Sequence, residues 1–131
     1  MFGDMPCDAF TRRGGRLVGR VVEIIVYQLK EGTGGLFHQT VKNVGAPLHH
    51  EAGLEILAFG NSLHSEDAYV LIRVFDGYDQ MTALLDRFYS SEAWKEGPRS
   101  TIVDNIITSS KSVLFLDDAA IEALKSSHTH T

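Results

Sequence analysis

Hydrophobic residues mark extended segments and helical segments that alternate along the chain. Runs rich in β-branched and aromatic residues predict four β-strands, at residues 21–29, 54–63, 68–75 and 112–116. The stretch that ends at Gly53 and the stretch that follows Phe75 carry apolar residues at helical spacing. The resulting order, β-α-β-β-α-β, predicts an α+β, ferredoxin-like fold with a four-stranded antiparallel sheet. We expect the first strand to lie between the last and the third.

The two predicted central strands are apolar on both faces. In the first strand, Val22, Ile24 and Val26 point to one side, and the residues that alternate with them are also largely apolar. The third strand has the same character, with Val70 and Ile72 on one side. A strand with one solvated face would carry polar residues at every second position. Two helices cover one face only, so we expect a second copy of the chain to cover the other, as a homodimeric α/β barrel.

The first predicted helix contains a proline. An apolar stripe follows the helical period at Phe37, Val41, Val44 and Leu48. Proline lacks an amide hydrogen, and its ring clashes with the carbonyl four residues back. We therefore expect Pro47 to kink or break the helix before Leu48.

Both ends of the chain lack a sustained hydrophobic period. We predict a flexible N-terminal tail over residues 1–20 and a C-terminal tail or short helix over residues 119–131, because neither end offers much apolar surface to bury. Residues 21–118 are predicted to form a single folded domain.

Composition and charge argue against several classes of partner. The 131 residues carry a net charge of -5, whereas a nucleic-acid surface needs clustered Lys and Arg, so we expect no nucleic-acid partner. No apolar stretch approaches the roughly 20 residues that span a bilayer, so we expect no membrane partner either. The single cysteine, Cys7, cannot form an internal disulfide. These features together predict a cytoplasmic location.

Several segments of the chain resemble NIPSNAP-like proteins. Residues 23–32, which read EIIVYQLKEG, are similar to the first strand of that family, usually E-L-R-x-Y-x-L-K-x-G. Residues 46–48 (APL), 74–76 (VFD) and 91–95 (SEAWK) are similar to later family segments. The resemblance implies the dimeric α/β-barrel fold and a homodimer. It implies no particular reaction, because the family is mostly without an established activity.

The chain departs from the family pattern at two positions. Ile25 stands where arginine is common, and Arg73 stands where an aromatic residue is frequent. The first departure removes the residue on which an anion-binding role in relatives would rest. The wider superfamily includes cofactor-free monooxygenases, haem-binding enzymes, cyclases and isomerases, so the fold by itself does not select one chemistry.

Two charged residues stand within apolar strands. Glu23 lies in the first predicted strand and Arg73 in the third. An unpaired buried charge is unfavourable by several kcal/mol unless its pKa shifts. Because the two strands are expected to be neighbours, we predict a Glu23–Arg73 ion pair. The alternative is a cleft in which Glu23 acts as acid or base and Tyr27, on the same face, donates a hydrogen bond.

Histidine supplies a further catalytic candidate. We consider His49 as a general base, although its spacing favours a solvent-exposed position beside the buried stripe. His38 lies close to three whole turns earlier, on the same side of the helix as His49 if Pro47 does not rotate it. The adjacent His50 points away by about 100°, so the pair cannot chelate one metal.

No cofactor is expected. The sequence contains no HxxxH or CxxC motif and no facial triad of carboxylate and histidine ligands, so we predict no metal site. The second predicted helix contains no histidine that would bind haem iron.

Two classes of function remain open. The first is a homodimeric binding module with a small apolar ligand pocket, in which Arg73, Trp94 and Tyr69 are the ligand-contact candidates. A large aromatic residue after an amphipathic helix more often closes a core, so a core position is favoured for Trp94. The second is a cofactor-independent enzyme of monooxygenase, isomerase or cyclase type that acts on an aromatic or carbonyl compound. Its proton-transfer candidates are Glu23, Tyr27 and His49. A wet cavity around Glu23 and Tyr27 favours the enzyme, and a packed interior favours the module.

Overall fold

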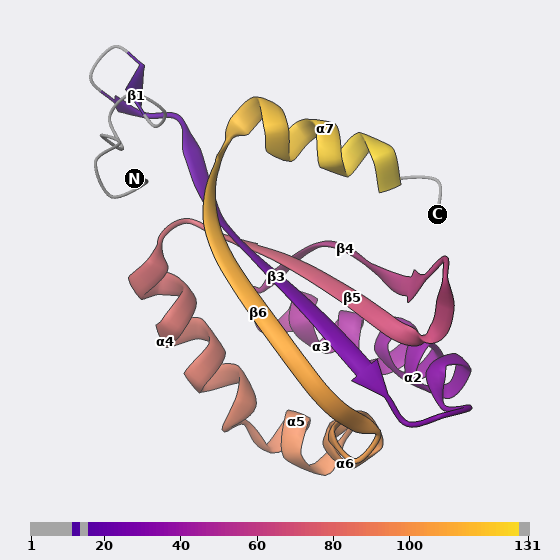
Figure 1. Cartoon of the computed structure of the whole chain (residues 1–131). Helices are drawn as coiled ribbons and strands as arrows, with labels where there is room; N and C mark the ends of the chain where they lie inside the picture. Colours follow the sequence, from indigo (N-terminus) through magenta and orange to yellow (C-terminus); the bar gives the residue numbers. More distant parts are fainter. Residues whose placement is uncertain (1–11, 14–15, 129–131) are drawn as a thin grey trace.

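The computed structural model describes residues 12–13 and 16–128. A four-stranded antiparallel sheet is formed by β3 (Gly19–Leu29), β4 (Glu55–Ser62), β5 (Ser65–Phe75) and β6 (Ile106–Asp117) (Figure 1). The strands lie in the order β4-β5-β3-β6, so the ferredoxin-like topology and the predicted strand order are confirmed. Two short strands, β1 (Arg12–Arg13) and β2 (Arg16–Leu17), pair with each other. Most of the predicted N-terminal tail lies outside the described residues.

Helices from both crossovers cover one face of the sheet. The first crossover contains α2 (Gly34–Thr40), a π-helical turn η2 (Val41–Gly45) and α3 (Ala46–Glu51). The second contains α4 (Tyr78–Tyr89), α5 (Glu92–Glu96) and α6 (Arg99–Val103) (Figure 1). Buried side chains that include Phe37, Tyr69, Leu85, Phe88 and Trp94 fill the space between these helices and the sheet. Trp94 is therefore a residue of the core.

The opposite face is partly covered by α7 (Asp118–His128), a helix of the same chain (Figure 1). Ile121 is 1% exposed and packs with Val22, Leu57 and Val74. The expectation that two crossover helices leave a face to be covered is correct, but the chain itself covers part of it. Val26, on the same face, remains 45% exposed.

The first helix does not break at Pro47. The π-helical turn precedes the proline, and the amide of Ala46 donates to the carbonyl of Val41, five residues back. Pro47 then stands in the first turn of α3, where a missing amide hydrogen is tolerated. The interruption of the α-helix predicted before Leu48 thus takes the form of a π turn, which ends at Gly45, ahead of the proline.

The π turn also changes which side chains of the first helix are buried. The inward-facing positions are Gly34, Phe37, Val41, Gly45 and His49, whereas Val44 is 41% exposed. The placement of Val44 on the buried stripe is wrong, because the 3.6-residue period of an α-helix does not hold through a π turn.

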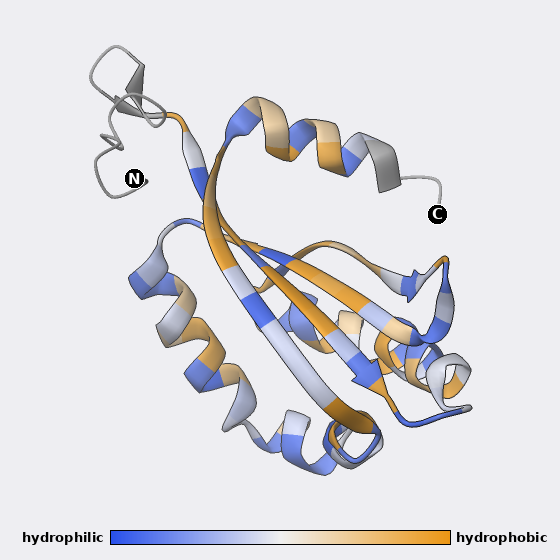
Figure 2. Ribbon diagram, viewed as in Figure 1, coloured by the Kyte–Doolittle hydropathy of each residue, from blue (hydrophilic) through white to orange (hydrophobic). Residues whose placement is uncertain are grey.

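The register of the sheet brings the candidate residues into pairs. Glu23 lies opposite Arg73, and Tyr27 lies opposite Tyr69, on the face that the crossover helices cover. Hydrophobic residues dominate the central strands, whereas the middle of β6 is hydrophilic (Figure 2). β6 begins at Ile106, well before the predicted residues 112–116. Hydrophobic alternation did not indicate this part of the strand, because residues 108–112 are polar and exposed.

Candidate functional site

A charged pair lies in the interior between the sheet and the helices. Glu23 is fully buried and Arg73 is 1% exposed. The Nε atom of Arg73 donates to Oε1 of Glu23 at 2.6 Å, which confirms the predicted ion pair. The other carboxylate oxygen, Oε2, lies 3.0 Å from the ammonium of Lys111, an ion pair without the alignment of a hydrogen bond. The charge of Glu23 is thus compensated from β5 and from β6.

His49 completes this buried network, and both of its ring nitrogens are engaged. Nδ1 lies 2.7 Å from the Gly45 carbonyl oxygen, which can only accept, so Nδ1 carries the hydrogen. Nε2 then accepts from Nη1 of Arg73 at 3.0 Å. Burial lowers the pKa of His49 to about 4, so the ring is neutral at pH 7. A neutral imidazole with two occupied nitrogens is a structural element here.

The remaining partner of Arg73 is a tyrosine at the edge of the core. Nη1 of Arg73 donates to the hydroxyl oxygen of Tyr89 at 2.8 Å. Burial acts to lower the pKa of Arg73, but Tyr89 and Glu23 outweigh it, and the net shift is upward. Arg73 is therefore a permanently charged hub that binds three side chains inside the fold.

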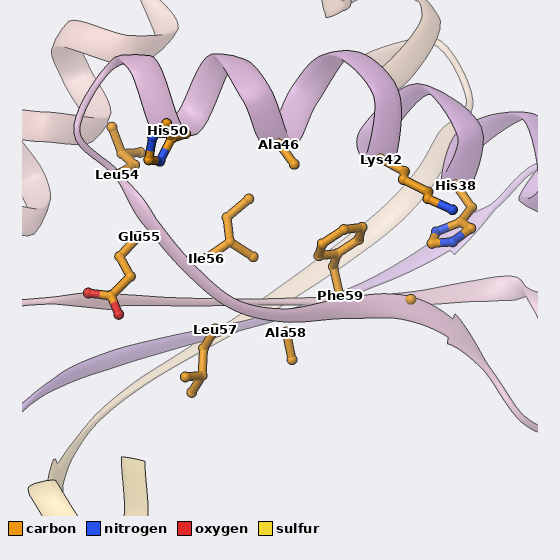
Figure 3. A pocket seen from close by; sticks show the side chains of 11 residues that line it. His38, Lys42, Ala46, His50, Leu54, Glu55, Ile56, Leu57, Ala58 and Phe59 are labelled. Carbon is orange, nitrogen blue, oxygen red and sulfur yellow. The ribbon is translucent and has the colours of Figure 1, made fainter. Parts of the chain in front are cut away.

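A groove of about 550 Å³ lies between the first helical segment and β4, an edge strand of the sheet (Figure 3). We call this hollow the edge groove. The side chains that border it include His38, Lys42, Ala46 and His50 on the helix and Ile56 and Phe59 on β4. Figure 3 shows the helical residues projecting toward the strand and the strand residues projecting toward the helix.

Two local irregularities build this groove. A straight α-helix rotates a row of residues four apart by about 40° per step, whereas a π turn is longer and turns the row back. The row from His38 to His50 consequently stays on one side of the helix. In β4, a register shift between Ile56 and Ala58 indicates a bulge, which allows Ile56 and Phe59 to face the same side.

The predicted alignment of His38 with His49 is wrong for the same reason. The extra residue of the π turn aligns His38 with His50, which lines the edge groove. His49 turns toward the sheet, away from its neighbour, in agreement with the divergence expected of adjacent helical residues.

A hydrogen-bonded pair stands at one end of the edge groove. Nδ1 of His38 lies 2.7 Å from the hydroxyl oxygen of Tyr69, which is fully buried. Burial raises the pKa of Tyr69, so the phenol keeps its proton and needs an acceptor for it. We assign Nδ1 of His38 as that acceptor, which leaves the hydrogen of the neutral ring on Nε2.

The acidic residue at the groove is already paired. Glu55 accepts a hydrogen bond from Arg20 at 3.0 Å, and its second oxygen lies 3.3 Å from the ammonium of Lys125 in α7. Burial acts to raise the pKa of Glu55, but these two cations outweigh it and lower the pKa. The carboxylate is thus bound to residues outside the groove lining.

The residues singled out from the sequence lie mostly in the packed interior. Glu23, Arg73, His49 and Trp94 are buried in the core or in its ionic network, and none of them borders the edge groove. Tyr27 packs against Phe37 with ring centroids 5.7 Å apart. Burial is the main cause that raises the pKa of Tyr27. Tyr69 differs from these residues because its side chain forms a hydrogen bond with a groove side chain, that of His38.

The groove residues themselves were not found by sequence reasoning. The signal that was available is the four-residue spacing of His38, Lys42, Ala46 and His50. With a helical period of 3.6 residues, this row drifts around the helix and does not stand out as one face.

Metal sites and membrane-spanning helices concern the part of the chain that the structure describes. Within it, no three His, Cys, Asp or Glu side chains come together as ligands for a metal ion. None of the helices there is both long enough and apolar enough to cross a bilayer.

Solved structures of NIPSNAP-domain proteins share the fold of this chain. A NIPSNAP family protein of unknown function from Agrobacterium tumefaciens superposes with a TM-score of 0.67 at 20% identity, over 76% of this chain and 90% of that one. The chain is NIPSNAP-like in fold. An uncharacterised NIPSNAP domain protein from Burkholderia xenovorans gives a TM-score of 0.64 at 16% identity, over 72% of this chain and 91% of that one.

The NIPSNAP-like fold also extends to a protein with a suggested activity. A candidate antibiotic biosynthesis monooxygenase from Nitrosomonas europaea matches with a TM-score of 0.56 at 14% identity, over 72% of this chain and 95% of that one. No protein-family model matches the chain, and no curated protein does. At these sequence identities the similarity shows a shared fold and does not indicate a function.

Proposed function

We propose that this chain is a homodimeric binding module that holds a small apolar ligand in the edge groove. The observation that carries the proposal is the groove itself, about 550 Å³ in volume and floored by Ile56 and Phe59. Sites for small molecules in proteins have volumes of roughly 300 to 1,000 Å³, with mostly apolar walls and a few placed polar groups. The edge groove has this size and this lining.

A binding role is favoured over catalysis by what the interior contains. The two carboxylate oxygens of Glu23 face Arg73 and Lys111, and the ring of His49 is neutral with both nitrogens bonded. A general base must reach its proton directly or through one water. These packed groups have no such access to the edge groove. A packed interior was expected for a binding module, so this arrangement supports the module over the enzyme.

The second candidate is a cofactor-independent enzyme acting on an aromatic or carbonyl compound. The hydrogen-bonded pair of His38 and Tyr69 at the end of the edge groove favours it, because a titratable ring then meets a bound molecule. Turnover of a carbonyl compound that is lost in His38→Gln but retained in His50→Gln would support this candidate.

The homodimer is supported by the sheet face that α7 leaves partly open. Val26 is 45% exposed and stands beside the half-buried Ile24 and Ile72 on this face. Leu114, on the other side of β3 and opposite Val22, is 37% exposed on the same face. Apolar surface gathered in one place marks an interaction site. A second copy would bring an identical surface, as a two-fold interface requires.

A neutral fluorescent probe, N-phenyl-1-naphthylamine, tests the groove. We expect saturable binding to the wild-type chain and its loss in Ala46→Phe, whose new ring fills the groove between the helix and β4. Ala83→Phe, which adds the same ring at an exposed position of α4, is the matched control and should bind as the wild type does. Equal binding by both variants would locate the probe elsewhere and reject the edge groove as the site.

A further inference from the structure

One end of the edge groove presents hydrogen-bond donors, and among the described residues that line the groove the one carboxylate, Glu55, lies at the other end. The hydrogen of the neutral His38 ring lies on Nε2, because Nδ1 accepts from the buried Tyr69. Lys42, one step further along the helical row, adds an ammonium group (Figure 3). Two donors on neighbouring positions of one row suit an anion, and charge-assisted bonds to carboxylate are among the stronger hydrogen bonds.

The opposite end of the groove has a different electrostatic character. Glu55 stands there beside Leu54 and His50, and Figure 3 shows it at the far side of Ile56 from Phe59. Because Arg20 and Lys125 neutralise this carboxylate, it neither attracts a cation strongly nor cancels the charge at the Lys42 end. The groove therefore has hydrogen-bond donors at one end and a charge-neutralised carboxylate at the other.

The stretch between the two ends is apolar. Ala46 faces Ile56 and Phe59 across the groove, and the ring of Phe59 packs against His38 with centroids 5.9 Å apart. An apolar body that lies on Ile56 would place its head group beside Phe59 and His38. Burial of that body supplies affinity, and the head group supplies orientation.

We infer that the ligand of the edge groove is a monocarboxylic acid with an apolar body, whose carboxylate is bound by His38 and Lys42. This inference rests on the proposed function, since it names the chemical class of the molecule held in the same groove. It assigns His38 and Lys42 to the head group, Ala46 and Ile56 to the body, and Tyr69 to positioning of the His38 ring through Nδ1.

A matched series of probes separates the head group from the body. The three probes are 2-naphthylacetate, its primary amide and 2-naphthylmethylammonium, which share a ring system and differ in charge. We expect the carboxylate to bind about tenfold more tightly than the amide, and the ammonium compound to bind most weakly, as one charge-assisted contact implies. Isothermal titration calorimetry or chemical-shift titration of the intact chain gives the three dissociation constants.

Variants assign each part of the groove to its role. Lys42→Met keeps the length of the side chain but removes the charge, so the preference for carboxylate over amide should fall to about threefold or less while amide binding persists. Lys95→Met removes an exposed charge on α5, outside the groove, and should keep the full preference. Ile56→Ala should weaken all three probes by a similar factor. Tyr69→Phe should reduce the preference with little effect on the amide.

The outcomes distinguish failure of the carboxylate inference from failure of the proposed binding function. Equal binding of the three probes, weakened by Ile56→Ala, would overturn the carboxylate inference and leave the apolar binding module standing. Tightest binding of the ammonium compound would overturn it too, as would an unchanged preference in a folded Lys42→Met variant. Absence of binding by every probe, together with failure of the neutral fluorescent probe, would reject the proposed function itself.

Discussion

At the scale of single residues, the fold depends on the compensation of a buried carboxylate. Glu23→Gln removes the negative charge and leaves Arg73, which is 1% exposed, without its ionic partner. Breaking one side of a buried pair commonly costs about 3 to 5 kcal/mol, so we expect a loss of this order in the free energy of unfolding. Urea denaturation followed by circular dichroism measures it. Glu31→Gln, at an exposed position, should change stability by less than about 0.5 kcal/mol.

A double variant separates the cost of leaving one charge uncompensated from the net contribution of the Glu23–Arg73 ion pair to stability. If the cost arises from an uncompensated charge, the double variant Glu23→Leu with Arg73→Met should be more stable than either single variant. A double variant that loses the full sum of the two single effects would show instead that the charges act independently.

The buried, neutral His49 should make the free energy of unfolding depend on pH. Its pKa in the folded chain is about 4, below the ordinary value of 6.5, so the unfolded chain binds one more proton between these two pH values. The free energy of unfolding should therefore fall as the pH drops from 6.5 to 4, by about 3 kcal/mol in total. His49→Gln, which cannot titrate but can donate and accept, should flatten this slope.

Thermal or urea unfolding of the wild type and His49→Gln at half-unit steps of pH measures the difference. His64→Gln removes an exposed histidine in the β4–β5 hairpin and serves as the matched control. Parallel profiles for the wild type and His49→Gln would contradict a neutral, buried His49.

The ion pair was predictable from sequence, whereas the role of His49 was not. Glu23 and Arg73 each interrupt an apolar strand, and a buried charge needs a partner whatever the register is. The sequence around His49 carries no such requirement, because a helical histidine is compatible with solvent or with the core. Its position depends on one added residue in the π turn, which hydrophobic periodicity does not reveal.

At the scale of elements, replacement of two glycines in the first helical segment by alanine should change the free energy of unfolding in opposite directions. A Cβ at Gly34 would overlap the backbone carbonyl of Glu66 in β5, so Gly34→Ala must push the start of α2 away from the sheet. A Cβ at Gly45 would have its nearest neighbours at 3.8 Å, an ordinary contact. We expect Gly34→Ala to lose about 1 to 3 kcal/mol and Gly45→Ala to gain about 0.5 to 1 kcal/mol.

Urea denaturation of the two variants under the same conditions measures both changes. A stabilised Gly34→Ala variant would contradict the close approach of α2 to the β4–β5 hairpin. A strongly destabilised Gly45→Ala variant would indicate that the π turn tolerates glycine alone.

The order of elements was predictable because each element has its own pattern, but their irregularities were not. Strand alternation and helical stripes survive in the sequence whether or not a bulge or a π turn is present. The bulge in β4 and the π turn before Pro47 each shift the phase by one residue, and those shifts build the edge groove. The topology of the fold was thus predictable, whereas the edge groove was not, because it depends on these two local shifts.

At the scale of the whole molecule, the crossover helices cover one face of the sheet and leave the other face uncovered. The apolar character of Val22 and Val74 indicates this from sequence, since both point away from those helices. The sequence did not indicate that α7 would take part of the face, because its apolar positions are few and end near residue 124. The surface left over is smaller than expected, and it contains Val26 and Leu114.

This remaining surface offers the sharpest test of the proposed homodimer. Val26→Lys places a charge in the centre strand of the open face, where a second copy would have to desolvate it, so we expect dissociation to monomers. Val103→Lys makes the same change on α6 at a valine of nearly equal exposure, 43% against 45%, and should leave the dimer intact. Sedimentation velocity at micromolar concentration, with circular dichroism to verify folding, compares the two variants with the wild type. A monomeric wild type would reject the homodimer. Equal dissociation of both variants would show that the dimer does not use this face, because Val26 lies on it and Val103 lies on α6.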